Sequence, residues 1–169
     1  MASNGVIEQV FEARKALFDE GLLDEHFEEL ESVEGPDDAT FMEDLVNSFL
    51  KDMKHLINLV GQELDQATPD TQALDQLLHQ IKGNTASVGA KQLSIICNQM
   101  RGHVLNGEIE RCKEAQVQLE TQRELLDQRF GVYFELRREL LPGIVTDGSP
   151  SPRSEVDDAE IDDVKGKEI

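Results

Sequence analysis

His79 is the side chain in this sequence best placed to do chemistry, because it is expected on the exposed face of a helix. The opposite, apolar face is defined by residues that recur at helical spacing, Leu74, Leu78, Ile81 and Thr85. His79 follows Leu78 by about 100° around the helix and therefore faces solvent. A neutral imidazole is a competent nucleophile near neutral pH, so an accessible histidine of this kind can accept a phosphoryl group.

Two residues about one turn further along the helix bear on this imidazole. Lys82 places a cation where it suits an incoming or covalently held phosphoryl group. Gly83 has no side chain, whereas the residue four positions ahead normally covers a helical side chain. Glycine inside a helix costs about 1 kcal/mol relative to alanine. A glycine that is kept at this position in spite of the cost indicates that His79 has to be accessible. These residues alone leave two interpretations open: a phosphoryl or anion site, and an ordinary surface histidine.

The distribution of charge singles out the same stretch. The 169 residues include 35 acids and 16 Lys or Arg, a formal net charge of −19. That excess argues against binding to nucleic acid or to an anionic membrane surface, because both attract cationic side chains. Residues 19–44 hold twelve acids and no Lys or Arg, whereas residues 76–107 hold no acid. If the protein handles an anionic group, residues 76–107 are where it is expected.

Helical periodicity dominates the chain and predicts an all-α protein. Six helices are expected: five over residues 6–21, 24–34, 38–66, 69–88 and 108–140, and one that carries Leu93 to Val104 and is closed by Asn106-Gly107. Short connections between the last four predict an antiparallel four-helix bundle, with the two additional N-terminal helices covering one end or side. Thr68 and Pro69 are interpreted as the cap and the first residue of the fourth helix. Cys97 and Cys112 fall in helical patterns and are interpreted as reduced core residues.

The pattern stops after residue 141. Residues 1–141 are expected to form the helical-bundle domain, and residues 142–169, rich in Pro, Gly, Ser and acids, a disordered acidic C-terminal tail. No apolar run approaches the roughly 20 residues of a membrane span, and no signal segment opens the chain. We therefore expect a cytoplasmic and nuclear protein.

The run from His79 to Ala90 resembles the signature of histidine-containing phosphotransfer (HPt) proteins, particularly the plant type. That family shows His-Gln-x-Lys-Gly-Ser-Ser-x-Ser-[Ile/Val]-Gly-Ala, and this chain reads His-Gln-Ile-Lys-Gly-Asn-Thr-Ala-Ser-Val-Gly-Ala. The departure is Asn84-Thr85, which replaces a serine pair and keeps its hydrogen-bonding capacity. Residues 23–27, Leu-Asp-Glu-His-Phe, also resemble the family's Leu-Asp-x-x-Phe segment. The resemblance spans about residues 6–140.

The resemblance implies an HPt-like bundle that carries phosphate in two-component His–Asp signalling, cytokinin signalling included. His79 would accept a phosphoryl group from the receiver-domain aspartate of a hybrid sensor histidine kinase and pass it to the aspartate of a response regulator. Lys82 would stabilise the phosphoryl charge, Gly83 would admit the partner, and Gln80 would support the site by hydrogen bonding or by contacting the partner.

The same resemblance implies partners and cofactors. The partners are receiver domains of hybrid histidine kinases and of response regulators, bound by a monomer. No cofactor or metal is expected on this chain, because Mg²⁺ belongs to the partner receiver domain. ATP-dependent kinase activity is not expected either, since no Gly-rich nucleotide loop or catalytic-loop motif is present.

Two other classes remain as alternatives. The first is a non-catalytic acidic helical adaptor, which would bind signalling partners without being phosphorylated. The family includes pseudo-HPt members that lack the histidine, and the presence of His79 argues against that kind. The second is a carboxylate-bridged metal bundle, for which Asp52-x-x-His55 supplies only one imperfect half of the required motif.

Overall fold

The structure is a computed structural model that describes residues 4–35 and 40–140. Six helices are present there: α1 (Asn4–Asp19), α2 (Glu25–Val33), α3 (Phe41–Leu64), α4 (Thr71–Val88), α5 (Lys91–Leu105) and α6 (Ile109–Leu140). These described residues contain no strand, in agreement with the all-α prediction. The expected tail, residues 142–169, lies outside the described residues, so the division of the chain after residue 141 stays a prediction.

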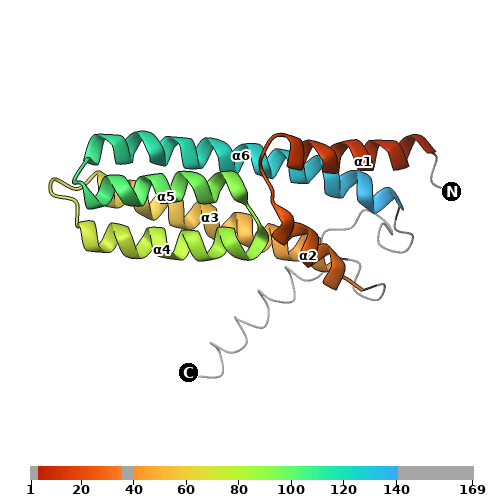
Figure 1. Cartoon of the computed structure of the whole chain (residues 1–169), viewed down its shortest axis with the longest axis horizontal. Helices are drawn as coiled ribbons and strands as arrows, with labels where there is room; N and C mark the ends of the chain where they lie inside the picture. Colours follow the sequence, from red (N-terminus) through yellow and green to blue (C-terminus); the bar gives the residue numbers. More distant parts are fainter. Residues whose placement is uncertain (1–3, 36–39, 141–169) are drawn as a thin grey trace, which may run out of the picture.

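The last four helices, α3 to α6, form the predicted antiparallel bundle (Figure 1). Each packs against the next in chain order, and α6 closes the ring by packing against α3. The buried side chains of the bundle are mostly aliphatic, as expected where amphipathic helices bury one face each. Among the described helices, none has both the length and the apolar character needed to cross a membrane.

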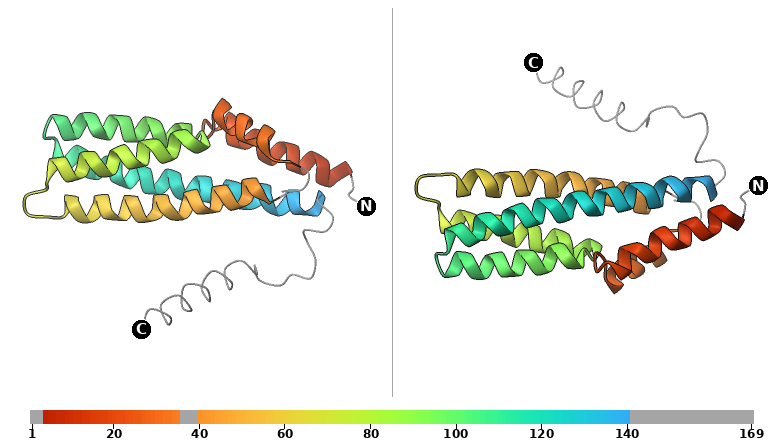
Figure 2. Two further views of the ribbon diagram at one scale, coloured as in Figure 1. Left: turned by 90° about the horizontal axis from the view of Figure 1, so that it is seen from below. Right: turned by 90° about the horizontal axis from the view of Figure 1, so that it is seen from above.

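The 32-residue helix α6 extends past the bundle, and α1 lies alongside its C-terminal half (Figures 1 and 2). Three rings pack in series there, because the centroids of Phe27 and Phe130, and of Phe130 and Phe134, are each 5.5 Å apart. Ion pairs add to this contact, among them Arg129 with Glu20 at 2.8 Å. The two N-terminal helices therefore cover one end of the bundle, as predicted.

Two large apolar residues of α1 are exposed. Leu17 is fully buried, but Ile7 and Phe11 expose 51% and 61% of their surface. α1 packs mainly along α6 rather than inside the ring of four helices. A helix with one main neighbour can bury only the side that faces that neighbour, so part of its apolar surface stays in solvent.

The start of α4 corrects the predicted cap. Asp70, and not Thr68, is the N-cap, and its carboxylate accepts hydrogen bonds from the backbone N–H groups of Gln72 and Ala73. Pro69 consequently precedes the cap instead of opening the helix. The backbone N–H of Asp70 donates to Glu63 at the end of α3, a contact across the turn that local sequence rules do not reveal.

Gly89, at the end of α4, forms a hydrogen bond that links this helix to the start of α2. The glycine has a left-handed backbone, with φ of 80°, and caps the C-terminus of α4. Its carbonyl accepts a hydrogen bond from the N–H of Asp24 at 2.9 Å, while the Asp24 side chain caps α2. A Cβ on Gly89 would lie 2.7 Å from the backbone nitrogen of Phe27. Glycine is therefore needed here both for its conformation and for the close approach.

We expect Gly89→Ala to lower the free energy of unfolding by at least roughly 1–2 kcal/mol, the strain of a left-handed L-residue alone, with the clash against α2 adding to it. The matched control is Gly131→Ala in the middle of α6, where a Cβ meets nothing within 4 Å. That change should raise the free energy of unfolding by about 0.5–1 kcal/mol. Urea unfolding followed by circular dichroism measures both, and equal effects of the two changes would contradict this account of Gly89.

Candidate functional site

The helix α4 presents His79 to solvent because its opposite face is completely buried. The predicted inner face is confirmed, with 0% exposure of Leu74, Leu78, Ile81 and Thr85, although Leu77, which the helical pattern also places there, is only half-buried. Their burial sets the rotation of α4 about its axis, and the outer face follows from it. His79, Lys82 and Gly83 are exposed, as predicted, and Gln80 is exposed as well. None of the described residues forms a hydrogen bond or ion pair with the His79 side chain.

The surface just beyond His79 is open and cationic. Lys82 forms no ion pair within residues 4–35 and 40–140, so its ammonium group is available to a ligand or partner. A Cβ added to Gly83 would meet no heavy atom within 4 Å. The absence of a side chain at Gly83 is therefore not required by packing inside this protein, which distinguishes it from Gly89.

An ion pair between α4 and α5 neutralises the acid one turn before His79. Arg101 Nε donates to Asp75 Oδ1 at 3.1 Å. Asp75 would otherwise place an unpaired negative charge on the same helix as His79, four residues away. Local sequence patterns do not reveal this pair, because its members are 26 residues apart. The one signal in the sequence is that Arg101 lies in a stretch without acids, so a carboxylate partner must come from outside that stretch.

Two buried side chains hold the backbone on which the exposed residues stand. Thr85 Oγ1 donates to the carbonyl of Lys82 at 2.9 Å, as the sequence suggested for this inward hydroxyl. The Cys97 thiol of α5 donates to the carbonyl of Leu78 at 3.1 Å. Burial raises the pKa of Cys97 to about 11, so the thiol keeps the proton that this hydrogen bond requires at neutral pH. Both cysteines, Cys97 and Cys112, are buried and free of disulfides.

Gln80 lies on the side of α4 that borders α3. It lines a hollow of about 340 Å³ between α3 and α4, together with Gln76 and Leu77 of its own helix and Gln62 and Glu63 of α3. The structure thus brings His79, Lys82 and Gly83 to one open surface and places Gln80 at its edge.

The other three histidines lie in different surroundings. The Nδ1 atoms of His26 and His103 are 3.3 and 3.0 Å from carboxylate oxygens, and His55 lies exposed on α3. Within the part of the chain that the structure describes, no group of three or more His, Cys, Asp and Glu residues is arranged to hold a metal ion. His79 and His55 are therefore the two histidines that form no ion pair with a described carboxylate, and of these two only His79 has both a lysine and a glycine one turn ahead of it on its helix.

Comparison with known proteins gives relatives of one kind. Residues 44–129 match the Hpt domain. The chain is 32% identical to histidine-containing phosphotransfer protein 4 of Arabidopsis thaliana over 116 residues, which are 69% of this chain and 91% of that protein. It is 30% identical to pseudo histidine-containing phosphotransfer protein 2 of Oryza sativa subsp. japonica over 134 residues, 79% of this chain and 89% of that protein.

Solved structures give the same result. A histidine-containing phosphotransfer protein from maize superposes with a TM-score of 0.74 at 27% identity, covering 80% of this chain and 99% of that one. One from Medicago truncatula gives a TM-score of 0.77 at 25% identity, covering 86% of this chain and 99% of that one. With its helical bundle and the matching domain, the chain belongs to the plant-type histidine-containing phosphotransfer proteins, the carriers of histidine phosphotransfer in two-component signalling.

Proposed function

We propose that His79 is the phosphoacceptor of a multistep His–Asp phosphorelay. It takes the phosphoryl group from the receiver-domain aspartate of a hybrid histidine kinase and passes it to the aspartate of a response regulator. The observation that carries this proposal is that the His79 imidazole is exposed and pairs with none of the described residues. The buried inner face of α4 sets the rotation of this helix and so directs His79 outward. A phosphorelay carrier needs such an accessible nucleophile, because each transfer takes place between two folded proteins.

The chemistry is an exchange of one bond to phosphorus for another. The unprotonated ring nitrogen of His79 attacks the phosphorus of an aspartyl phosphate, so that a P–N bond forms while the P–O bond to the carboxylate breaks. The aspartate leaves as a carboxylate, and the other ring nitrogen keeps its proton. Transfer to the response regulator is the reverse reaction on a second receiver. No ATP is consumed in either step, in keeping with a carrier rather than a kinase.

The neighbours of His79 have separate roles in this proposal. Lys82 supplies positive charge to the phosphoryl oxygens, and no described carboxylate competes for it. Gly83 leaves room for the acidic site of the receiver, and Gln80 supports the site from its edge. The pair formed by Arg101 and Asp75 keeps a free carboxylate away from an incoming dianion. The Mg²⁺ ion expected for such transfers is held by the partner receiver domain.

A non-phosphorylated adaptor is the alternative. It is supported by the similarity to a rice protein that is called a pseudo histidine-containing phosphotransfer protein. An adaptor has no use for an accessible nucleophile. The presence of His79, with Lys82 and Gly83 beside it, therefore favours the carrier.

We expect His79→Gln to abolish acceptance of phosphate from a phosphorylated receiver domain in the presence of Mg²⁺. The wild-type protein should gain an acid-labile, alkali-stable phosphate, measured with ³²P on gels. His55→Gln is the matched control, since His55 is also exposed and lies on α3. Phosphate uptake by His79→Gln at the wild-type level would refute the proposal, and no uptake by the wild type from any receiver would favour the adaptor.

Lys82→Ala should slow phosphotransfer by about tenfold, the equivalent of roughly 1.4 kcal/mol of transition-state stabilisation, without changing the circular dichroism spectrum. The physical reason is the loss of a cation next to the transferred group. Lys91→Ala removes an equally exposed lysine from the start of α5 and serves as a control for overall charge. Equal slowing in both variants would mean that Lys82 contributes only to the overall electrostatic potential of the surface and has no specific role at the transferred group.

Gly83→Ala should separate stability from activity. Because the added Cβ meets no atom within 4 Å, it should raise the free energy of unfolding by about 1 kcal/mol through helix propensity. The same methyl group should lower the transfer rate, because it partly covers the approach to His79. Gly131→Ala provides the comparison, with increased stability and an unchanged rate. An unchanged transfer rate in Gly83→Ala would remove access as the role of this glycine.

A further inference from the structure

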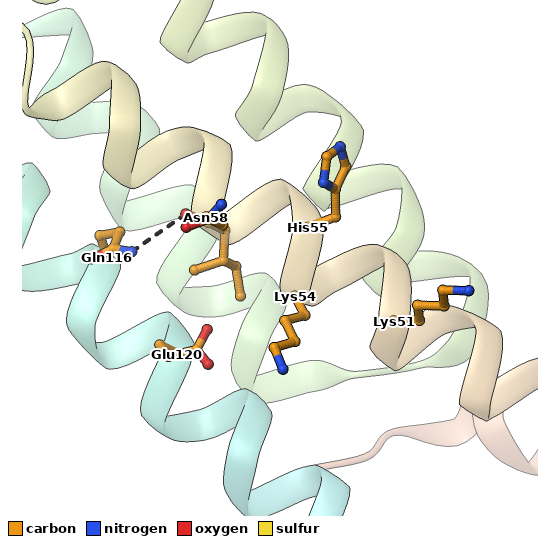
Figure 3. A pocket seen from close by; sticks show the side chains of 7 residues that line it. Lys51, Lys54, His55, Asn58, Gln116 and Glu120 are labelled. Atoms are coloured by element: carbon orange, nitrogen blue, oxygen red, sulfur yellow. Dashed lines mark hydrogen bonds between the residues drawn. The ribbon is translucent and has the colours of Figure 1, made fainter.

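A groove between α3 and α6 lies on the side of the bundle opposite the pair formed by α4 and α5. Two adjoining hollows of about 410 and 330 Å³ make it up, and both are lined by Asn58 and Gln116. Gln116 Nε2 donates to the carbonyl of Ile57 at 3.3 Å and so joins the two helices within the groove (Figure 3). We call this feature the α3/α6 groove.

Three lysines line the α3/α6 groove, and none has an ion-pair partner among the described residues: Lys51, Lys54 and Lys113. In contrast, all seven described arginines pair with carboxylates. Figure 3 shows Lys54 extending from α3 toward α6. The acids of the groove are Asp65 and Glu120, and Glu120 is already bound to Arg123 at 2.9 Å. The groove therefore has an excess of uncompensated positive charge in a chain of net charge −19.

Other hollows of the surface carry the opposite charge. The hollow between α1 and α6 is lined by four glutamates, Glu8, Glu12, Glu135 and Glu139, and by no Lys or Arg. The hollow beside Gln80 is lined by Glu63 and by no cation. Of these surfaces, the α3/α6 groove is the one suited to an acidic peptide segment. It also offers apolar contact, because Val117 in its lining is 61% exposed.

The chain itself contains a segment of matching character, which lies beyond the described residues. Residues 155–163 read Glu-Val-Asp-Asp-Ala-Glu-Ile-Asp-Asp, with six acids, no base and two β-branched apolar residues. Carboxylates of this segment complement the lysines of the groove, and Val156 and Ile161 suit the apolar surface around Val117. No other stretch of the chain combines such acid density with a position outside the described helices.

The geometry permits this segment to reach the groove within one molecule. The ion pair of Arg138 with Glu43 holds the end of α6 beside the start of α3. Lys51 follows Glu43 by eight residues, or about 12 Å along the helix. The fifteen residues from Leu140 to Glu155 span at most about 50 Å when fully extended. Tethering at this distance gives an effective concentration on the order of millimolar, at which a modest affinity is sufficient.

We propose that residues 155–163 of this chain dock in the α3/α6 groove, with their carboxylates against Lys51, Lys54 and Lys113. The docked segment covers the side of the bundle that faces away from Lys82 and Arg101, and the outer face of α4 with His79 stays open. This contact is independent of whether His79 carries phosphate, so its test and the phosphotransfer assays can fail separately.

The test places a nitroxide spin label on the full-length chain through Ser154→Cys. Because Cys97 and Cys112 are buried, the label is directed to the introduced thiol. We expect the backbone amide signals of Lys54, Asn58 and Gln116 to be broadened in the NMR spectrum, and those of the exposed face of α4 to be retained. Broadening should disappear in the double variant Lys51→Glu, Lys54→Glu, and also in 1 M salt, where the Debye length is about 3 Å. Lys91→Glu, the matched control, should leave the broadening in place.

Three results would overturn the proposal. Broadening that survives in Lys51→Glu, Lys54→Glu would show that the groove lysines do not hold the segment. Broadening centred on Lys82 and Lys91 would place the segment on the phosphoacceptor face instead. Broadening that vanishes on dilution with unlabelled protein would assign the contact to a second copy of the chain.

Discussion

The complete burial of one face of α4 is the constraint on which the rest of this structure depends. Leu74, Leu78, Ile81 and Thr85 are fully excluded from solvent, and turning the helix by a single residue would expose part of this face and bury polar side chains in its place. The position of His79 outside the bundle is therefore a consequence of core packing rather than of any contact made by the imidazole itself. An imidazole held in this way stays accessible to solvent without needing a pocket of its own.

Around this helix the charged residues divide into two groups with different physical roles. Several arginines join elements that are distant in sequence, as Arg101 does with Asp75 and Arg129 with Glu20, because the planar guanidinium can hold a carboxylate in a defined geometry. Several lysines, including Lys82 on α4 and the three in the α3/α6 groove, form no ion pair with any of the described residues. In a strongly acidic protein such cations mark the surfaces that would suit an anionic group, either the proposed phosphoryl group or the proposed acidic segment.

Much of the fold followed from local pattern. Helical periodicity predicted six helices, the antiparallel bundle and the inner face of α4, and the structure confirms them. The predicted cap of α4 is wrong, because the cap is Asp70 rather than Thr68. Local pattern also does not reveal that Ile7 and Phe11 are exposed. Both outcomes depend on neighbours that are not adjacent in sequence, namely Glu63 across the turn and the single helix α6 beside α1.

The sequence by itself determined which residues share the outer face of α4, because the spacing of His79, Lys82 and Gly83 along one helix fixes their relative directions. Only the tertiary structure decided what surrounds that face: the ion pair of Asp75 with Arg101, the thiol of Cys97 on the Leu78 carbonyl, and the approach of α2 to Gly89. A helix has a regular period that can be counted along the chain, whereas contacts between helices depend on how whole faces pack together.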